Sequence, residues 1–430
     1  SPSTTLSGAI GAGDTVIPVA STAGYAPNGR IRIDSEDINY SSIAGNTFTG
    51  AQRGAAGTTA AAHAFGATAL QSQCTINSTG VVGNARRAVE KAIQQNYDAM
   101  IAYAKANGDG NVYFRRWNGS SWGAESTATA VPADIHFFVL KFARTRNEAI
   151  LGTLSSNGDI RVQIWNGNTQ TWGATTLLAN VDAGDSAYRG FDIEYETIGD
   201  RAIVVYNDNS ADPNYRIWDG TAWSGATNIN LPTTGEAFWI ELSPNPLNDE
   251  IAMITLDANY DVKGMRWPGG GASGTAWDNM GDLGAWDTSA ANTNNCPGSV
   301  NPCKVIDVAY EQLSGRAMFI WGDNANGLQR YRIWNGATAS LNLAANLDLT
   351  AIPGSDMNGE ANWLRLAARP NSDELLYGVQ DENRDLFTAR WTGAWVSPIR
   401  HDGSTEDINN RSFEIVYEAH SANPGVAWIV

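Results

Sequence analysis

A short apolar segment that recurs from about residue 97 to the end of the chain constrains the fold more than any other feature. The copies occupy residues 99–103, 149–153, 202–206, 251–255, 317–321, 375–379 and 426–430. Their starts lie 49 to 66 residues apart, a period that is typical of a solenoid or a propeller and that accommodates the four strands of a propeller blade. The segments are short and rich in β-branched and aromatic residues, which excludes helical repeats.

A strand that ends in tryptophan follows each of the first six apolar segments. In every copy one residue and then a glycine come after the tryptophan. Asn-Gly and Asp-Gly supply the positive φ values that a tight hairpin turn requires. The turns therefore mark strand ends at Trp117, Trp165, Trp218, Trp267, Trp334 and Trp391.

A third strand comes before several of the apolar segments, where residues 191–196, 305–311 and 413–418 alternate apolar and polar side chains. Strict alternation marks a half-buried strand. The chain is therefore predicted to be all-β, with a seven-bladed β-propeller over residues 96–430. The seventh copy stops at Val430 after its second strand, and open edges invite aggregation. We expect residues 67–79 and 85–93 to supply ring-closing strands, and a six-bladed ring with a trailing strand is the alternative.

Residues 1–66 are predicted to form a separate small β module, because they lack tryptophan and alternate in residues 15–19 and 29–36. Residues 67–95 then form a connector that includes the candidate ring-closing strands. Residues 31–40, 47–58 and 61–63 resemble a short module of phage tail proteins and pilin-like secreted proteins. Residues 74–80 and 84–90 resemble the closing β segment of minor pilins of the mannose-sensitive haemagglutinin type IV pilus system.

The pilin resemblance implies a particular setting for the propeller. In such families an apolar N-terminal helix packs into the filament, and the β portion faces outward. The propeller would then be displayed at the cell surface, with pilus subunits as partners. Cys74 is either a buried free thiol or the mate of a cysteine outside this sequence.

The charge balance limits the classes of partner that the chain can bind. Asp and Glu number 45 against 28 Lys and Arg, for a net charge of −17, so the surface should repel nucleic-acid phosphates and anionic headgroups. The sequence has no signal peptide and no apolar run of transmembrane length, so we expect a processed or trimmed chain without direct membrane insertion. Abundant Gly, Asn, Thr and Ser indicate an extracellular or cell-surface protein.

Cys296 and Cys303 flank a short Gly/Pro loop, and that spacing predicts a disulfide between them. A zinc site is disfavoured because no histidine lies nearby. Asp- and Asn-rich hairpins could hold calcium, although such side chains also make turns, and both interpretations stay open. The calcium candidates are Asp208, Asp212, Asp323 and Asp381.

Catalytic groups are not evident. His63, His136, His401 and His420 lie in no sequence context that suggests a triad, and Asp192, Glu194 and Glu196 alternate along one strand, where convergence across a cleft cannot be read. We therefore predict no enzymatic activity, no catalytic residue and no cofactor.

The repeated tryptophan is the strongest chemical feature. A large aromatic residue at one fixed place in every copy is what blade-to-blade packing requires, since each can bury about 150–250 Å². A second tryptophan just past the turn is the better ligand contact, together with arginines near the repeat. We predict Trp122, Trp172, Trp223, Trp395, Arg216 and Arg332 as ligand-binding residues. Cross-strand pairing with glutamates is the alternative role for the arginines.

The first functional hypothesis is a non-enzymatic extracellular display or adhesion protein whose propeller binds a surface glycan or protein. The second is a carbohydrate-binding propeller lectin. The third is a secreted glycan-active hydrolase.

Overall fold

The structure is a computed structural model that describes residues 3–25, 29–55, 58–71, 99–105, 109–118, 121–182, 188–233, 235–269, 277–280, 282, 284–288, 290, 303–323, 329–336, 345–347, 360–405, 411–418 and 427–429. Every regular element in these ranges is a β-strand, which confirms the all-β class. None of the described residues forms a helix long and apolar enough to cross a bilayer.

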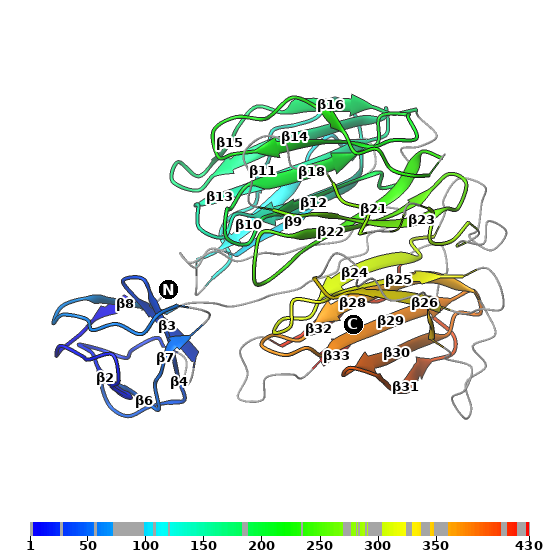
Figure 1. The fold of residues 1–430 in the computed structure, drawn as a ribbon. Coiled ribbons are helices and arrows are strands. Elements are labelled where there is room, and N and C mark those ends of the chain that lie inside the picture. The colour runs from blue at the N-terminus through cyan, green and yellow to red at the C-terminus, as the bar shows by residue number, and fades with distance from the viewer. Residues whose placement is uncertain are drawn as a thin grey trace.

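The N-terminal module consists of two small sheets with a core of its own (Figure 1). Alternation in Gly29–Ile33 buries Ile31 and Ile33 against Phe48. The five-stranded sheet has the order β1 (Ser3–Thr5), β8 (Thr68–Gln71), β3 (Gly29–Ile33), β4 (Glu36–Tyr40), β7 (Gln52–Ala55), and the three-stranded sheet has the order β2 (Val16–Pro18), β6 (Thr47–Thr49), β5 (Ser42–Ile43).

Strand β8 corrects one prediction. Thr68–Gln71 pairs with β1 and β3, and Ala69 is fully buried in the module core. This strand therefore belongs to the module and cannot close the ring, so the prediction is wrong for this part of 67–79. The rest of the predicted connector, residues 72–95, lies outside the described residues.

Seven antiparallel sheets follow in chain order among the described residues, and we number them as sheets 1 to 7. They are sheet 1 (β9 Ala99–Tyr103, β10 Tyr113–Trp117, β11 Ser126–Thr127), sheet 2 (β12 Ile135–Phe142, β13 Glu148–Ser155, β14 Asp159–Asn166, β15 Thr171–Trp172, β16 Thr176–Asn180), sheet 3 (β17 Phe191–Tyr195, β18 Ala202–Tyr206, β19 Asn214–Trp218, β20 Thr227–Asn228), sheet 4 (β21 Ala237–Pro244, β22 Ile251–Asp257, β23 Val262–Trp267), sheet 5 (β24 Ile306–Tyr310, β25 Ala317–Gly322, β26 Gln329–Trp334, β27 Ala345–Leu347), sheet 6 (β28 Ala361–Ala368, β29 Leu375–Asp381, β30 Leu386–Trp391, β31 Trp395–Asp402) and sheet 7 (β32 Ile415–Tyr417, β33 Ala427–Ile429).

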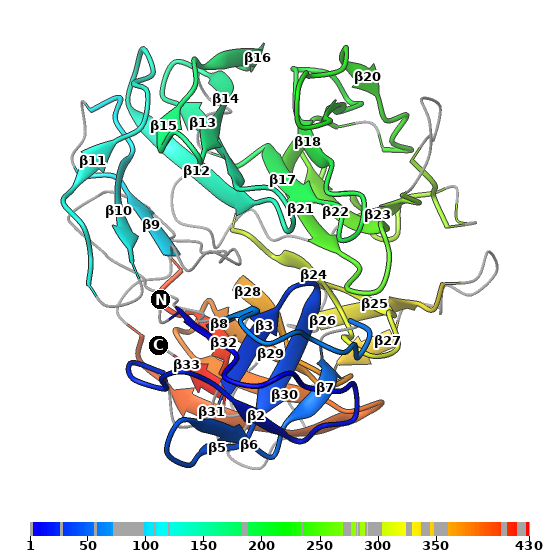
Figure 2. The same ribbon diagram turned by 90° about the vertical axis from the view of Figure 1, so that its left-hand side faces the viewer.

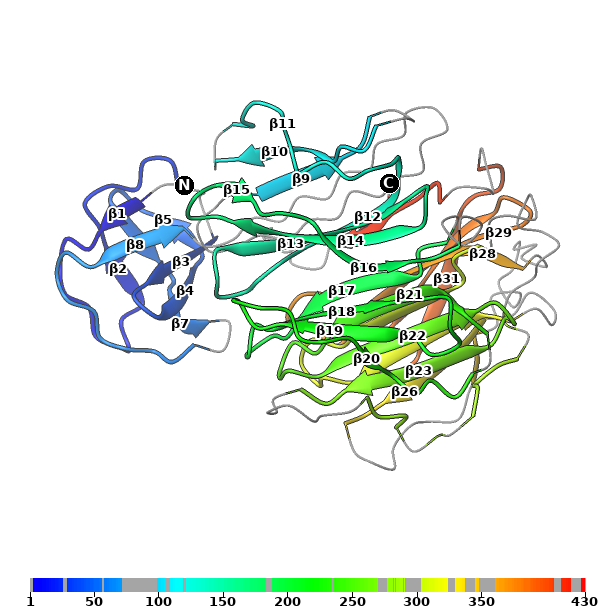
Figure 3. The same ribbon diagram turned by 90° about the horizontal axis from the view of Figure 1, so that it is seen from above.

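The seven sheets form a β-propeller. Each consecutive pair of sheets shares a buried apolar core, and the innermost strands β12, β17, β21, β24, β28 and β32 contact one another in turn. Figure 2 shows the sheets following one another around a common centre, from cyan through green and yellow to orange. Figure 3 shows the N-terminal module beside them.

The predicted seven-bladed closure stays a prediction. Sheet 1 has no described strand inside β9, and sheet 7 has only β32 and β33 among the described residues. The apolar segments of the sequence are the second strands of sheets 2 to 7, and they are almost wholly buried in sheets 2 to 6. The tryptophan-ended strands β10, β14, β19, β23, β26 and β30 pair with them as predicted.

Alternate sheets differ in their innermost strand. In sheets 2, 4 and 6 this strand has eight residues and a register shift near its start, whereas β17 and β24 have five residues and no shift. The aromatic residues after the shifts meet, with ring centroids 5.7 Å apart for Phe137 and Trp239 and 6.2 Å apart for Trp239 and Trp363. Over sheets 2 to 6 the innermost strands therefore alternate between two forms.

Cys303 is buried and disulfide-bonded. Its predicted mate Cys296 lies outside the described residues, as does Cys74. The pairing of Cys296 with Cys303 therefore stays a prediction.

Candidate ligand-binding site

Three of the six repeated tryptophans hydrogen-bond to buried glutamates of the preceding sheet. Trp218 Nε1 donates to Glu148 at 2.9 Å, and Trp267 Nε1 donates to Glu196 at 2.8 Å. Trp391 Nε1 makes the same bond to Glu311 at 2.8 Å. These tryptophans therefore join neighbouring sheets, as the packing interpretation predicts.

The glutamates of these junctions are held by further donors. Arg201 pairs with Glu196 at 2.6 Å, and Arg316 pairs with Glu311 at 2.6 Å. In the other junctions a tyrosine hydroxyl donates to the glutamate, as Tyr195 does to Glu148 at 2.9 Å. Burial and that carboxylate raise the pKa of Tyr195 well above its ordinary value. Arg201 and Arg316 are not among the arginines near the repeated tryptophans. Of those, Arg266 pairs with Glu250 at 2.7 Å and Arg390 pairs with Glu374 at 3.4 Å, which is the alternative role predicted for the arginines of the repeat.

In four of the turns a second tryptophan packs on the first. Ring centroids lie 5.4 to 5.6 Å apart in the pairs Trp117–Trp122, Trp165–Trp172, Trp218–Trp223 and Trp391–Trp395. Trp122 is 36% exposed. The predicted contacts Trp172, Trp223 and Trp395 are half-buried.

Trp267 and Trp277 form a fifth pair, with ring centroids 6.0 Å apart. The sequence does not indicate this pair, because its members are ten residues apart. Trp172 and Trp395 also contact Phe114 and Tyr331 of the preceding sheets. Their ring faces are therefore largely engaged in packing.

Arginine occupies the position two residues before the repeated tryptophan in alternate sheets. Sheets 1, 3 and 5 have Arg115, Arg216 and Arg332 there, whereas sheets 2, 4 and 6 have Gln163, Met265 and Ala389. Side chains two residues apart on a strand share a face. Each arginine therefore lies on the same face as its tryptophan, and Trp218 packs toward sheet 2.

Arg332 has its charge compensated. It forms an ion pair with Asp282, and its guanidinium lies 4.9 Å from the ring centre of Trp286. Both partners belong to the segment that follows sheet 4. Arg115 donates to the carbonyl of Gly123 at 3.3 Å.

Arg216 differs from both. Its Nε is buried without a hydrogen-bond partner, as is the Nε of Arg332, but no described residue forms an ion pair or a hydrogen bond with the Arg216 guanidinium, whereas Asp282 pairs with Arg332. Residues 160–181 of the facing sheet contain neither Asp nor Glu, and the packed residues there, Val162 and Leu178, are apolar. An unsatisfied buried donor costs about 1–3 kcal/mol.

The structure therefore places Arg216, Trp218 and Trp223 on one face of the sheet 3 hairpin, since Trp223 bridges Trp218 across the turn. We call this set the Arg216 junction. It combines an aromatic pair with an unpaired, permanently charged fork of N–H donors. Of the six predicted ligand-binding residues, it brings Arg216 and Trp223 together, whereas Trp122, Trp172, Trp395 and Arg332 lie in other sheets.

The calcium candidates do not converge. Asp208 accepts a hydrogen bond from Ser210 at 2.6 Å, Asp323 pairs with Arg330, and Asp381 accepts the backbone N–H of Asp385 at 2.8 Å. The carbonyl of Asp212 accepts from Ser210. These residues lie in three sheets, and the described part of the chain holds no group of three His, Cys, Asp or Glu placed to bind a metal. In the described hairpins the side chains of Asp208, Asp323 and Asp381 take part in turn contacts or an ion pair.

The histidines serve separate local contacts. His63 lies in the N-terminal module, 2.8 Å from Asp34 and 2.8 Å from Glu36. His401 lies 2.7 Å from the hydroxyl of Thr388. His420 lies outside the described residues.

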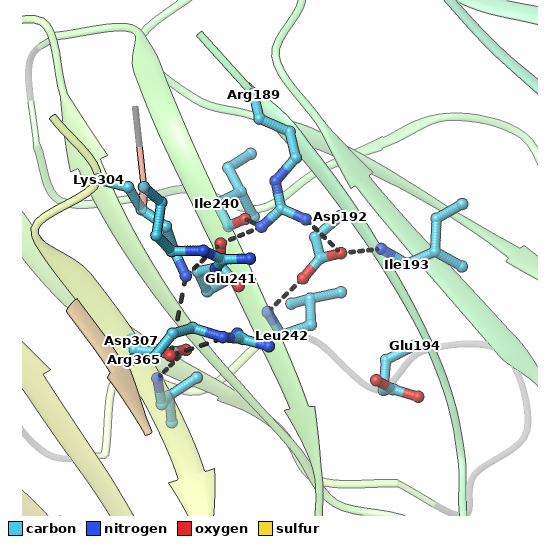
Figure 4. A network of polar contacts seen from close by, with 12 residues as sticks. Arg189, Asp192, Ile193, Glu194, Ile240, Glu241, Leu242, Lys304, Asp307 and Arg365 are labelled. Atoms are coloured by element: carbon cyan, nitrogen blue, oxygen red, sulfur yellow. Dashed lines mark hydrogen bonds and ion pairs between the residues drawn. The ribbon is translucent and has the colours of Figure 1, made fainter. Parts of the chain in front are cut away.

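A charged network joins the innermost strands of sheets 3 to 7, and Figure 4 shows the part that extends from Arg189 to Arg365. Glu241 pairs with Arg189 and with Lys304 Nζ at 2.9 Å, and Arg365 pairs with Glu414 at 3.0 Å. Four basic and four acidic side chains take part, namely Arg189, Lys304, Arg365, Arg411, Asp192, Glu241, Asp307 and Glu414. The charges balance, so this network is a structural element.

No family model and no curated protein sequence matches the chain. A lectin structure from Burkholderia pseudomallei is similar over 88% of this chain and 100% of that chain, with 13% identity and a TM-score of 0.49. A lectin from Aleuria aurantia, described as a six-bladed β-propeller with a novel fucose recognition mode, is similar over 72% of this chain and 92% of that chain, with 12% identity and a TM-score of 0.40. A post-proline cleaving enzyme from Rickettsia typhi is similar over 77% of this chain and 46% of that chain, with 12% identity and a TM-score of 0.42.

Proposed function

We propose that the propeller is a carbohydrate-binding domain whose binding site is the Arg216 junction. The observation that carries this proposal is an unpaired guanidinium on the same face as the Trp218–Trp223 pair. A sugar offers an apolar ring face and hydroxyl oxygens, and these suit an aromatic ring and N–H donors, respectively. Ligand sites in proteins commonly combine such aromatic walls with a few polar groups.

Arg332 is a weaker candidate of the same kind. It lies over Trp286, but Asp282 engages its guanidinium. A ligand there would have to compete with that carboxylate. We therefore place the principal site in sheet 3.

A cell-surface role is the second part of the proposal. The resemblance of the N-terminal module to pilin-like secreted proteins supports display at the cell surface, with a surface glycan as the partner and pilus subunits as neighbours. Binding without turnover would make the chain a non-enzymatic adhesin.

Glycan-array binding by the 430-residue chain tests this proposal. Trp223→Ala should weaken binding of any glycan hit by about fivefold or more, because an aromatic ring that stacks on a sugar contributes about 1 kcal/mol. Leu247→Ala is the matched control, since Leu247 is 51% exposed in a turn away from the junction. Retained binding in Trp223→Ala would refute this site, and hydrolysis of any bound glycoside would refute the non-enzymatic part.

A further inference from the structure

The three equivalent arginines differ in the charge that faces them. The segment after Trp267 contains Asp278, Asp282 and Asp287, and Asp282 neutralises Arg332. The corresponding segment that faces Arg216 contains no acidic residue between Asp159 and Asp182. Arg216 is thus left without a carboxylate partner among the described residues, in contrast to Arg332.

This lack of compensation stands out in so acidic a chain. The net charge is −17, and elsewhere even the buried Lys304 is matched by Glu241 and Asp307. A guanidinium keeps its charge at all physiological pH values. Within the described residues no carboxylate pairs with the Arg216 guanidinium, which leaves its countercharge to be supplied by solvent ions or by a ligand.

We propose that the Arg216 junction selects sugars that carry an anionic group, a carboxylate or a sulfate. This inference rests on the proposed carbohydrate-binding function and specifies its ligand class. Planar anions of this kind accept two parallel bonds from a guanidinium, and such charge-assisted bonds are roughly twice as strong as neutral ones. A neutral sugar hydroxyl would satisfy the donors but would leave the charge unpaired.

The aromatic pair fixes where the sugar ring would lie. Trp223 is half-buried beside Trp218 and on the face that carries Arg216. A ring stacked on Trp223 would direct one substituent toward the guanidinium, since both side chains project from the same face of one hairpin. The anionic group is therefore expected on the sugar that stacks, and not on a distant residue of the glycan.

The experiment uses an array of matched glycan pairs in which each neutral glycan is printed beside its uronic acid, sialylated or sulfated counterpart. The acidic member should bind about tenfold or more tightly than its neutral mate, and raising NaCl from about 50 to 300 mM should weaken that preference through screening. Carboxylated and sulfated members distinguish the two sources of charge. Isothermal titration with inorganic sulfate measures binding of the anion alone.

Variants separate this inference from the proposed function. Arg216→Gln should abolish the preference for acidic members, and Arg216→Lys should restore it only in part, because an ammonium lacks the planar fork. Arg390→Gln makes the same charge change at a side chain that is 51% exposed, and it should retain the preference.

Equal binding of neutral and acidic members, lost in Trp223→Ala, would overturn the anionic selectivity while the carbohydrate-binding function stands. Absence of binding to every glycan would overturn both. Saturable binding of inorganic sulfate without any glycan would also overturn the inference, because the junction would then be an anion site and not a sugar site.

Discussion

The charged network of the inner strands and the Arg216 junction differ in whether a positively charged side chain has a carboxylate partner. Around Glu241 every cation has a carboxylate, with Arg189 and Lys304 on either side. At Arg216 the described structure provides none. Compensated charge favours a fixed arrangement of strands, whereas uncompensated charge favours a ligand, and the two regions should therefore respond differently to the loss of one side chain.

The largest expected effect is the loss of one acid from the inner network. Burial alone would raise the pKa of Glu241, but Arg189 and Lys304 hold it well below its ordinary value. Glu241→Gln should destabilise the propeller by about 3–5 kcal/mol, because removing one partner leaves buried cations uncompensated. Urea unfolding followed by tryptophan fluorescence measures this change for the propeller alone, since the first tryptophan is Trp117.

A double variant is the control for this prediction. Replacing the pair by Glu241→Leu and Lys304→Met removes both charges, and well-packed apolar replacements of a buried pair are often neutral. The double variant should therefore be more stable than Glu241→Gln. Equal destabilisation would show that shape and not charge balance sets the cost.

Part of this architecture can be predicted from the sequence. The period of the apolar segments and the glycine after each repeated tryptophan were sufficient for the strands and the propeller, because both signals are local. The Trp–Glu junctions were not predicted, since Trp267 and Glu196 are 71 residues apart. The spacing of the repeats does not indicate which distant residues the propeller brings into contact.

The alternation of the innermost strands over sheets 2 to 6 was also not predicted from the sequence. It depends on register shifts at Phe137, Trp239 and Trp363, and a shift of one residue changes which side chains face the centre without changing the composition. The same holds for β8, whose short run Thr68–Gln71 gives no sign of which sheet it joins. Arg216 was predicted as a contact, but its lack of a partner follows only from the placement of sheet 2.

A second test compares the network with an acidic rim at the start of sheet 6. Burial raises the pKa of Glu360 to about 7, and Glu382 adds to the rise. Burial also raises the pKa of Asp381 to about 7. Because these folded-state values exceed the ordinary ones, their stabilising contribution is complete below about pH 4 and is lost as the pH rises through about 7.

Glu414 in the network behaves in the opposite sense. Burial alone would raise its pKa, but Arg365 and Arg411 lower it to about 2. Its contribution is present above about pH 4.5 and is lost as the pH falls toward 2. The urea midpoint should therefore fall on both sides of a maximum at mildly acidic pH, and Glu360→Gln should flatten the alkaline side only. Glu125→Gln, at a half-buried acid bonded to Lys105 outside sheet 6, should leave the alkaline side unchanged, and an unaltered profile in Glu360→Gln would contradict the assignment.

The smallest expected effect on stability is at Arg216 itself. Arg216→Met removes a donor that has no partner, so the free energy of unfolding should stay the same or rise by up to about 1 kcal/mol. Arg332→Met is the matched comparison, because it deprives Asp282 of its ion-pair partner and should lower the urea midpoint. Glycan binding should show the reverse order, with the greater loss in Arg216→Met. If Arg216→Met destabilised the propeller as much as Arg332→Met, the guanidinium would have a structural partner and the contrast between the two regions would not hold.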